Sequence, residues 1–254
     1  DIRHKHHLPN YGVFDEFRIF EAGELPEPII FKGVKIGLPI CEDLWRPGVA
    51  SYLSKKGAEI LISPNGSPWR RSAMSERAAV LGRNIHNEGL PLVYVNQIGG
   101  QDELVFDGGS FVVNASGEII YQASQFQEEV FSFDLEVQVK DIISDSKLTL
   151  NIKKDAIPEL QSHKTFNELE SMYEALKLGV ADYVQKNNFQ KVLVGLSGGI
   201  DSALTATIAV DALSSENVIG IAMPSKYNPD SSLEDAKNLA TNLGIEFKII
   251  EIMK

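Results

Sequence analysis

The pattern of apolar and polar positions along the chain changes near residue 136. Before that point, short apolar runs rich in β-branched residues predict buried strands, and segments of helical character lie between the first three of them. These strands are predicted at 33–40, 59–64, 91–98, 109–115, 117–123 and 128–135, and the helices at roughly 46–57 and 70–88. The order predicts an α/β layer that ends in antiparallel strands.

A polar stretch, residues 140–165, carries no long apolar run, which is typical of a linker. After it, apolar residues recur at three- and four-residue steps and predict one apolar helix face. They are Phe166, Leu169, Met172, Tyr173, Leu176, Val180, Tyr183 and Val184. Thr165 and Glu168 have the spacing of a capping box at the start of this helix.

Strands and helices alternate regularly in the last part of the chain. Strands are predicted at 191–196, 217–223 and 246–252, and helices at 201–213 and 231–244. Ser231 and Glu234 have capping-box spacing at the start of the second helix. Strands that alternate with helices predict a parallel, doubly wound sheet.

Composition narrows the function classes. The chain has 254 residues, 43% of them hydrophobic, and a net charge of −11, which argues against a general nucleic-acid binder. No apolar run reaches the ~18–20 residues of a transmembrane helix. A single cysteine excludes an internal disulfide and favours a reducing compartment, so we expect a cytoplasmic protein with no membrane or nucleic-acid partner. The chain starts without methionine and stops after a strand-like run, so we expect an internal fragment.

A glycine-rich loop, GLSGGIDSA at 195–203, lies between a predicted strand and a predicted helix. The N-terminus of such a helix binds anions through free backbone N–H groups. The loop matches neither a Walker A motif nor the dinucleotide fingerprint G-x-G-x-x-G. An acidic residue in a phosphate loop requires an intervening metal ion, and an ordinary glycine-rich turn is the alternative. The candidate phosphate-binding residues are Gly195, Ser197, Gly198, Gly199, Asp201 and Ser202, and the resemblance described next implies that the phosphates are those of ATP.

The run SGGIDS resembles the signature of the ATP pyrophosphatase family, whose members cleave ATP between the α and β phosphates and adenylylate a carbonyl oxygen. Residues 223–245, MPSKYNPDSSLEDAKNLATNLGI, resemble the NAD synthetases within that family, although Asn228–Pro229 departs from the small residues expected there. The resemblance implies ATP and Mg²⁺ as cofactors, with Asp201 as a metal ligand.

The only cysteine of the chain, Cys41, ends a predicted strand and precedes Glu42 and Asp43. A lone cysteine is commonly a small buried hydrophobic residue. Two adjacent carboxylates would be costly in an apolar core, however, and the end of a strand is a common place for an active site. A nucleophilic cysteine needs a nearby base or cation.

Residues 5–16, KHHLPNYGVFDE, and 37–45, GLPICEDLW, resemble the nitrilase superfamily, whose catalytic set is Glu, Lys and Cys. The likeness continues through 63–69 and 95–112, and is closest to the glutaminase domain of glutamine-dependent NAD synthetases. It implies Cys41 as nucleophile and Lys5 as the cation that stabilises the oxyanion. It also implies a glutamine pocket lined by Tyr11, Glu42, Trp45, Ser67 and Arg77, with Glu16 as an additional active-site glutamate.

Other interpretations stay open for parts of this set. The run RHKHH at 3–7 would also suit a metal site or a solvated basic patch, although no cysteine or carboxylate stands at metal-ligand spacing. Trp45 and Trp69 would also suit a plain core. The general-base glutamate of the family lies well before the lysine, and only four residues precede Lys5.

The combined resemblance implies a partial nitrilase-like α-β-β-α sandwich over 1–140, a linker over 141–165 and a partial doubly wound nucleotide-binding domain over 166–254. The implied activity is that of a glutamine-hydrolysing, ATP-dependent ligase that amidates nicotinic acid adenine dinucleotide to NAD. We expect these residues by themselves to be inactive and the complete enzyme to be a homo-oligomer. The alternatives are a different amidotransferase, such as a GMP or asparagine synthetase, or an inactive regulatory protein. The Cys41 segment argues against the former, because those enzymes use unrelated glutaminase folds, and the intact motifs argue against the latter.

Overall fold

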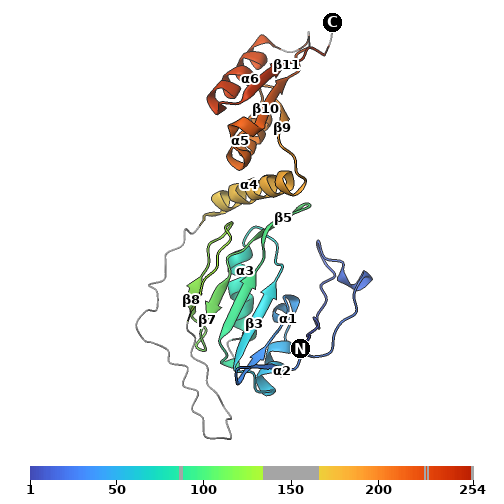
Figure 1. Ribbon diagram of the computed structural model, residues 1–254, viewed down its shortest axis with the longest axis vertical. Helices are drawn as coiled ribbons and strands as arrows, with labels where there is room; N and C mark the ends of the chain where they lie inside the picture. Colours follow the sequence, from blue (N-terminus) through green and yellow to red (C-terminus); the bar gives the residue numbers. More distant parts are fainter. Residues whose placement is uncertain (86–87, 134–165, 226, 228, 253–254) are drawn as a thin grey trace. The chain divides into compact units, whose positions relative to one another are not determined.

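The computed structural model describes residues 1–85, 88–133, 166–225, 227 and 229–252 (Figure 1). Contacts divide the chain into two compact units. Unit 1 contains residues 1–98 and the described residues from 106 to 133, and unit 2 contains 99–105 and the described residues from 166 onward. The linker predicted at 141–165 lies outside the described residues.

Unit 1 is built on a sheet whose strand order is β1-β2-β3-β4-β7-β8. Its strands are β1 (Ile29–Phe31), β2 (Val34–Gly37), β3 (Ile60–Asn65), β4 (Leu92–Asn96), β7 (Phe111–Val113) and β8 (Ile119–Gln122). The central strands β2, β3 and β4 run parallel, and the remaining pairs are antiparallel. The carboxyl ends of the parallel strands therefore meet at one edge, where ligands bind in such sheets.

Three helices cover this sheet: α1 (Glu42–Trp45), α2 (Val49–Lys55) and α3 (Ala73–Ile85). All three contact one another, and α2 also contacts β2. The core between helices and sheet combines Leu44 and Leu53 with Leu61 and Leu92, all of them fully buried. The apolar runs of the sequence thus become strands because burial on this face removes their side chains from water.

The predicted elements of unit 1 are confirmed except at two places. Residues 91–98 are not one strand, because β4 ends at Asn96 and a hairpin of β5 (Ile98–Gln101) and β6 (Leu104–Asp107) follows. A strand over 128–135 is wrong for 128–133, while 134–135 lie outside the described residues. There the Phe131 ring stacks on Tyr121, and Val130 is fully exposed. Side-chain contacts, not a ladder, therefore hold this segment.

Unit 2 contains a parallel sheet in the order β11-β10-β9. Its elements are α4 (Glu168–Lys186), β9 (Val192–Gly195), α5 (Ile200–Leu213), the short helix η3 (Ser215–Asn217), β10 (Val218–Ala222), α6 (Asp230–Leu243) and β11 (Glu246–Ile249). Helices α5 and α6 contact each other and the strands, and α4 contacts α5. Alternation of strands and helices thus gave the predicted parallel α/β layer.

The capping box predicted at Ser231 and Glu234 is wrong, and of the box predicted at Thr165 and Glu168 the first residue lies outside the described residues. Helix α4 begins two residues later than predicted, so Asn167 is its N-cap: its side chain accepts the Glu170 N–H at 3.0 Å, and the Glu170 carboxylate accepts the Asn167 N–H at 3.0 Å. Helix α6 begins after Pro229 without a side-chain cap. Capping-box spacing therefore occurs at more than one offset near the start of α4, and spacing alone does not identify the N-cap.

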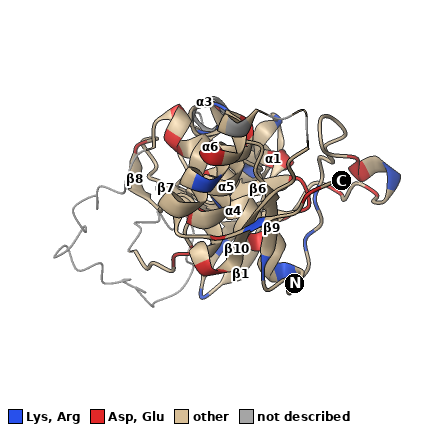
Figure 2. Cartoon of the chain, turned by 90° about the horizontal axis from the view of Figure 1, so that it is seen from above, with Lys and Arg blue, Asp and Glu red and all other residues tan. Residues whose placement is uncertain are grey.

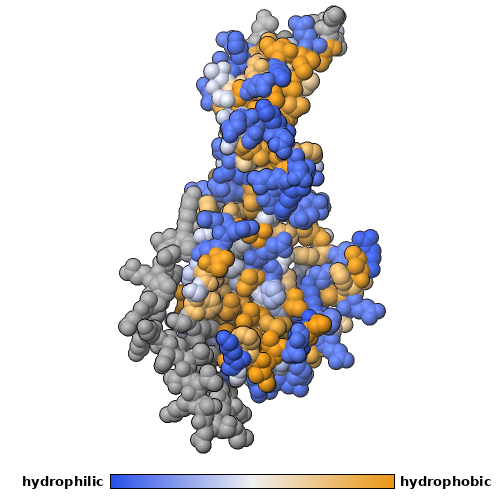
Figure 3. Space-filling model, viewed as in Figure 1, coloured by the Kyte–Doolittle hydropathy of each residue, from blue (hydrophilic) through white to orange (hydrophobic). Residues whose placement is uncertain are grey.

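Figure 2 shows that basic residues, Lys and Arg, and acidic residues, Asp and Glu, are interspersed along the chain. Figure 3 shows apolar surface on the viewed face of both units. In unit 1 the exposed apolar side chains include Val13, Phe17, Phe20, Ile30 and Phe31. Among the described helices, none has the length and apolar character needed to cross a membrane.

A buried ion pair joins α3 to the end of β6. The Arg77 guanidinium donates to both Asp107 oxygens, at 2.9 and 2.7 Å, and both side chains are buried. Gln125 donates a further bond to Asp107 at 2.9 Å. A buried pair of this kind is costly to break, because removal of one partner leaves an uncompensated charge.

A close backbone approach in unit 2 requires glycine at position 198. Gly198 has φ of 82°, and a Cβ there would lie 2.5 Å from the Ser232 carbonyl oxygen of α6. At the adjacent Gly199, φ is −89° and a Cβ would meet only the Ser197 hydroxyl at 3.3 Å. The close approach of the first turn of α6 therefore requires a residue without a side chain at position 198, whether or not a ligand is bound.

We expect Arg77→Met to lower the free energy of unfolding of unit 1 by about 3–5 kcal/mol, because Asp107 would be left buried and unpaired. Arg70→Met, which breaks the exposed pair with Glu76, should cost less than about 1 kcal/mol. Urea unfolding followed by tryptophan fluorescence measures this, since both tryptophans lie in unit 1. Equal losses in the two variants would contradict a buried pair.

We expect Gly198→Ala to destabilise unit 2 by more than about 1–2 kcal/mol, the cost of the left-handed conformation alone, because the methyl group also meets the Ser232 carbonyl. Gly199→Ala is the matched control and should change little. Hydrogen exchange of peptides from the loop and from α6 should rise in the first variant only. Equal exchange in both variants would show that the loop and helix do not approach closely.

Candidate functional site

The carboxyl ends of β2, β3 and β4 place the candidate residues of unit 1 at one edge of the sheet. Cys41 follows β2, Ser67 follows β3 and Asn96 ends β4. The Cys41 N–H donates to the Pro64 carbonyl at 3.1 Å, and the Ser67 N–H donates to the Asn96 side chain at 3.0 Å. Parallel pairing thus brings together residues that are more than 20 positions apart in sequence.

Cys41 occupies a sharp turn between β2 and α1. Its backbone has φ of 47° and ψ of −102°, an unusual conformation for a residue with a side chain. The Leu44 N–H closes the turn on the Cys41 carbonyl at 3.0 Å. Strain of this kind survives only where the surroundings enforce it, and such residues cluster at active sites.

Lys5 and Glu16 form a close ion pair in the N-terminal segment. The Lys5 ammonium lies 2.7 and 2.9 Å from the two Glu16 oxygens, and both side chains are mostly buried. Glu16 opens the short helix η1 (Glu16–Arg18), and its N–H donates to Pro9. Glu16, the additional glutamate implied by the resemblance, is therefore in direct contact with Lys5.

The charge of Lys5 reaches the Cys41 thiol. Burial raises the pKa of Cys41 above its usual value, the Lys5 ammonium and a hydrogen bond with the Gly66 backbone lower it, and Glu42 and Glu16 raise it again. The thiol is therefore protonated at neutral pH, and a base must take its proton before it acts as a nucleophile.

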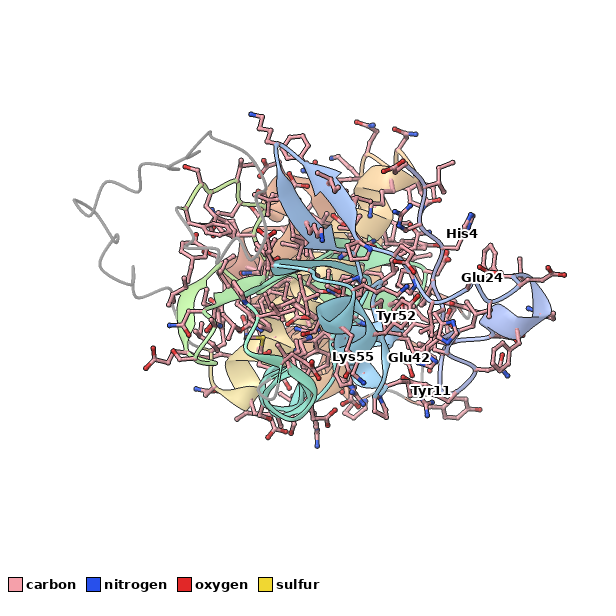
Figure 4. The ribbon with its side chains drawn as sticks, turned by 90° about the horizontal axis from the view of Figure 1, so that it is seen from below. His4, Tyr11, Glu24, Glu42, Tyr52 and Lys55 are labelled. Carbon is pink, nitrogen blue, oxygen red and sulfur yellow. The ribbon has the colours of Figure 1, made fainter. Side chains whose placement is uncertain are left out.

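Tyr11 and Glu42 point toward each other beside this turn (Figure 4). The Tyr11 hydroxyl donates to Glu42 Oε2 at 2.7 Å, and Arg46 Nε donates to Glu42 Oε1 at 2.9 Å. Burial, together with this bond to Glu42, raises the pKa of Tyr11 to about 12. Tyr11 is thus a hydrogen-bond donor at any physiological pH, and Glu42 has a partner on each oxygen.

The remaining pocket residues occupy different environments. Arg77 donates to the Ser67 carbonyl at 2.9 Å and to its hydroxyl at 3.3 Å, and its other bonds include the pair with Asp107. Arg77 therefore supports Ser67 from the buried side. The Trp45 ring lies near the Arg70 guanidinium, 5.9 Å from its centre, and Arg70 and Trp45 are both partly accessible.

Sequence reasoning gave no role to several polar residues of this edge. They are Asp43, Tyr94, Asn96 and Asp107, all buried. Asn96 donates to the Ser67 and Gly108 carbonyls, and Tyr94 stacks on Phe111 with ring centres 4.7 Å apart. The signal available for them was a polar residue at the end of an apolar run.

The glycine-rich loop of unit 2 is organised by its two serines. Ser202 accepts the Ser197 N–H at 3.2 Å and donates to the Gly199 carbonyl at 2.9 Å, and the two hydroxyls are 3.1 Å apart. Gly199 is the N-cap of α5 and has no side-chain cap. The loop and the first turn of a 14-residue helix therefore present backbone N–H groups and hydroxyls to solvent, as anion sites do.

Asp201 lies exposed in the first turn of α5, beside this loop. Carboxylate and hydroxyl oxygens are the ligands that Mg²⁺ prefers, together with phosphate oxygens and water. The residues present therefore fit a magnesium ion that shares its ligands with a nucleotide. Within the described part of the chain, no three His, Cys, Asp or Glu side chains are grouped as a protein-only metal site, and this holds for the histidines of 3–7.

Two family models match the chain. The carbon-nitrogen hydrolase model matches residues 1–142, and the NAD synthase model matches residues 172–254. The first match covers the sheet, the Cys41 turn and the Lys5 segment, and the second covers the glycine-rich loop.

Named relatives agree with this division. The chain is 43% identical over 248 residues to the glutamine-dependent NAD(+) synthetase of Rhodobacter capsulatus, a match that covers 98% of the chain and 43% of that protein. It is 42% identical over 268 residues to that of Aquifex aeolicus, with 99% and 47% covered. The chain thus spans less than half the length of the curated relatives it matches.

A solved structure extends the agreement to the fold. The glutamine-dependent NAD+ synthetase of Acinetobacter baumannii in complex with ADP superposes with a TM-score of 0.83 at 38% identity, covering 98% of the chain and 44% of that protein. The predicted fold class and the predicted resemblance are therefore confirmed. The chain belongs to the carbon-nitrogen hydrolase family through its first 142 residues and continues into an NAD synthase segment.

Proposed function

We propose that this chain carries the glutaminase and ATP-binding elements of a glutamine-dependent NAD synthetase. The proposal is carried by the strained turn at Cys41, where the Lys5 ammonium lowers the pKa of the thiol. The same chain contains a glycine-rich loop whose groups fit a nucleotide. The glutamine-dependent NAD(+) synthetases that it resembles over nearly its whole length support the same conclusion.

In the glutaminase step, the Cys41 sulfur attacks the side-chain amide carbon of glutamine. The C–N bond breaks, the thiol proton passes through a base to the leaving nitrogen, and ammonia departs from a glutamyl thioester. Water then hydrolyses the thioester to glutamate and the free thiol. Lys5 stabilises the oxyanion of each tetrahedral intermediate, and Glu16 orients Lys5.

The glutamine pocket is proposed to involve Tyr11, Glu42, Trp45 and Ser67. The Tyr11 hydroxyl and the Glu42 carboxylate offer a donor and an acceptor beside the Cys41 turn. Arg77 acts from behind, because its guanidinium is already bound to Ser67 and Asp107. Ser67 is thus the member of this pair that faces the substrate.

In the second step, ATP converts the carboxylate of nicotinic acid adenine dinucleotide into an adenylate and releases pyrophosphate. Ammonia then attacks the activated carbonyl, and AMP leaves with formation of NAD. The glycine-rich loop binds the pyrophosphate portion through Ser197, Gly198, Gly199 and Ser202. Asp201 would hold a magnesium ion there, and that ion would supply positive charge to offset the phosphate oxygens. Cytoplasmic location and homo-oligomeric assembly stay predictions.

Cys41→Ala should lower glutamine-driven NAD formation by about 10³-fold or more, because the nucleophile is lost. Synthesis driven by ammonium chloride should be unchanged, because it bypasses the thioester. The assay uses the full-length protein with ATP, magnesium and nicotinic acid adenine dinucleotide. Loss of both activities in Cys41→Ala, or of neither, would contradict the role of Cys41. If the unaltered protein is inactive with both glutamine and ammonium, a regulatory role is favoured instead.

Asp201→Asn should raise the magnesium concentration needed for half-maximal ATP use by about tenfold or more, because a charged ligand is lost. Thioester formation at Cys41 should persist. Asp211→Asn, on the same helix and bonded to Tyr173, is the matched control and should leave the magnesium dependence unchanged. An unaltered magnesium dependence in Asp201→Asn would exclude this carboxylate as a ligand.

A further inference from the structure

The Asp43 carboxylate is fully buried, two residues beyond Cys41. It accepts three backbone N–H groups: that of His7 at 2.7 Å, that of Ile40 at 3.0 Å and that of His6 at 3.1 Å. A buried carboxylate is costly unless hydrogen bonds replace its hydration. Here charge-assisted bonds to the main chain supply that compensation.

The three donors come from two segments that are far apart in sequence. Ile40 directly precedes Cys41, whereas His6 and His7 directly follow Lys5. One carboxylate therefore joins the backbone beside the proposed nucleophile to the backbone beside the proposed oxyanion cation. Since the bonds are made to N–H groups, they set the position of the chain and not merely of a side chain.

The segment that carries Lys5 depends on such bonds. Residues 1–28 contain no strand, and their described helix is the single turn η1. The bonds of Gly23 to the Lys5 carbonyl and to the His6 ring hold this segment to itself. The bonds to Asp43, together with that of Tyr11 to Glu42, hold it to the turn that bears Cys41.

We propose that Asp43 is a positioning residue of the glutaminase site, which sets the place of Lys5 relative to Cys41. The inference rests on the proposed function. Both oxygens of the carboxylate are bonded to main-chain N–H groups, and the side chain is fully buried. It acts through the backbone of residues 5–7 and not as a base.

The test measures the pH dependence of Cys41 alkylation by iodoacetamide, read by mass spectrometry of the peptide that contains Cys41. Lys5→Met should slow alkylation at pH 7, because the ammonium lowers the pKa of the thiol. Asp43→Asn should also slow alkylation, by about threefold to tenfold, because a displaced Lys5 ammonium lowers the pKa of the thiol less. The double variant should match Lys5→Met alone.

The sign of the effect separates this role from others. If Asp43 acted only as a negative charge, its neutralisation would lower the pKa of Cys41 and speed alkylation. A faster or unchanged rate in Asp43→Asn overturns the proposal, and so does a further fall in the Lys5→Met background. The other titratable groups that act on the thiol, Tyr11, Glu16, Glu42, Arg77 and Tyr94, are not substituted in any of these variants.

Asp102→Asn, the same substitution on an exposed turn, is the matched control and should leave the alkylation profile unchanged. If Asp43→Asn does not fold, hydrogen exchange of the unaltered protein still tests whether Asp43 holds the backbone of residues 6 and 7. The amides of His6 and His7 should be protected although no strand or helix contains them, and exchange at the rate of an unstructured peptide overturns the proposal. Neither the alkylation nor the hydrogen-exchange measurement requires glutamine turnover. A negative result for Asp43 is therefore distinct from a failure of the proposed glutaminase function, which the NAD assay tests.

Discussion

The arrangement of unit 1 depends on two buried carboxylates, Asp43 and Asp107, whose charges need hydrogen-bond donors in place of water. Asp43 is compensated by backbone N–H groups, and Asp107 by the Arg77 guanidinium and Gln125. Because an unpaired charge is costly in a dry environment, Asp43 holds the N-terminal segment, which contains no strand, to the Cys41 turn, and Asp107 holds α3 to the end of β6. The strained turn at Cys41 directly precedes α1, the helix that carries Asp43.

The same edge explains why the proposed site has its composition. Parallel strands end together, so Cys41, Ser67 and Asn96 become neighbours although they are separated by whole helices. Asn96, at the end of β4, exchanges hydrogen bonds with the backbone of Ser67, which follows β3. A thiol whose pKa is raised by burial and lowered by Lys5 then needs only a base and a substrate to react.

Unit 2 follows a related rule with different chemistry. In the described part of unit 2, the two serine hydroxyls bond within the loop and thereby shape it. Gly198 also lies against the first turn of α6, where a side chain would meet the Ser232 backbone. Asp201 stays exposed on the next turn, which is where a shared metal ion would need its protein ligand.

The sequence by itself determined the local elements and the chemistry of the motifs. Apolar runs and helical periodicity located β2, β3, β9, β10, α4 and α5 to within a few residues, and the two motif segments indicated Cys41, Lys5 and the glycine-rich loop. Only the tertiary structure decided which polar groups meet. The roles of Asp43 and Asp107, the support of Ser67 by Arg77 and the actual cap of α4 depend on bonds between distant segments, or on a choice among near-equal local options. Local pattern cannot encode them, because burial that makes an unpaired charge expensive arises only when the chain has folded.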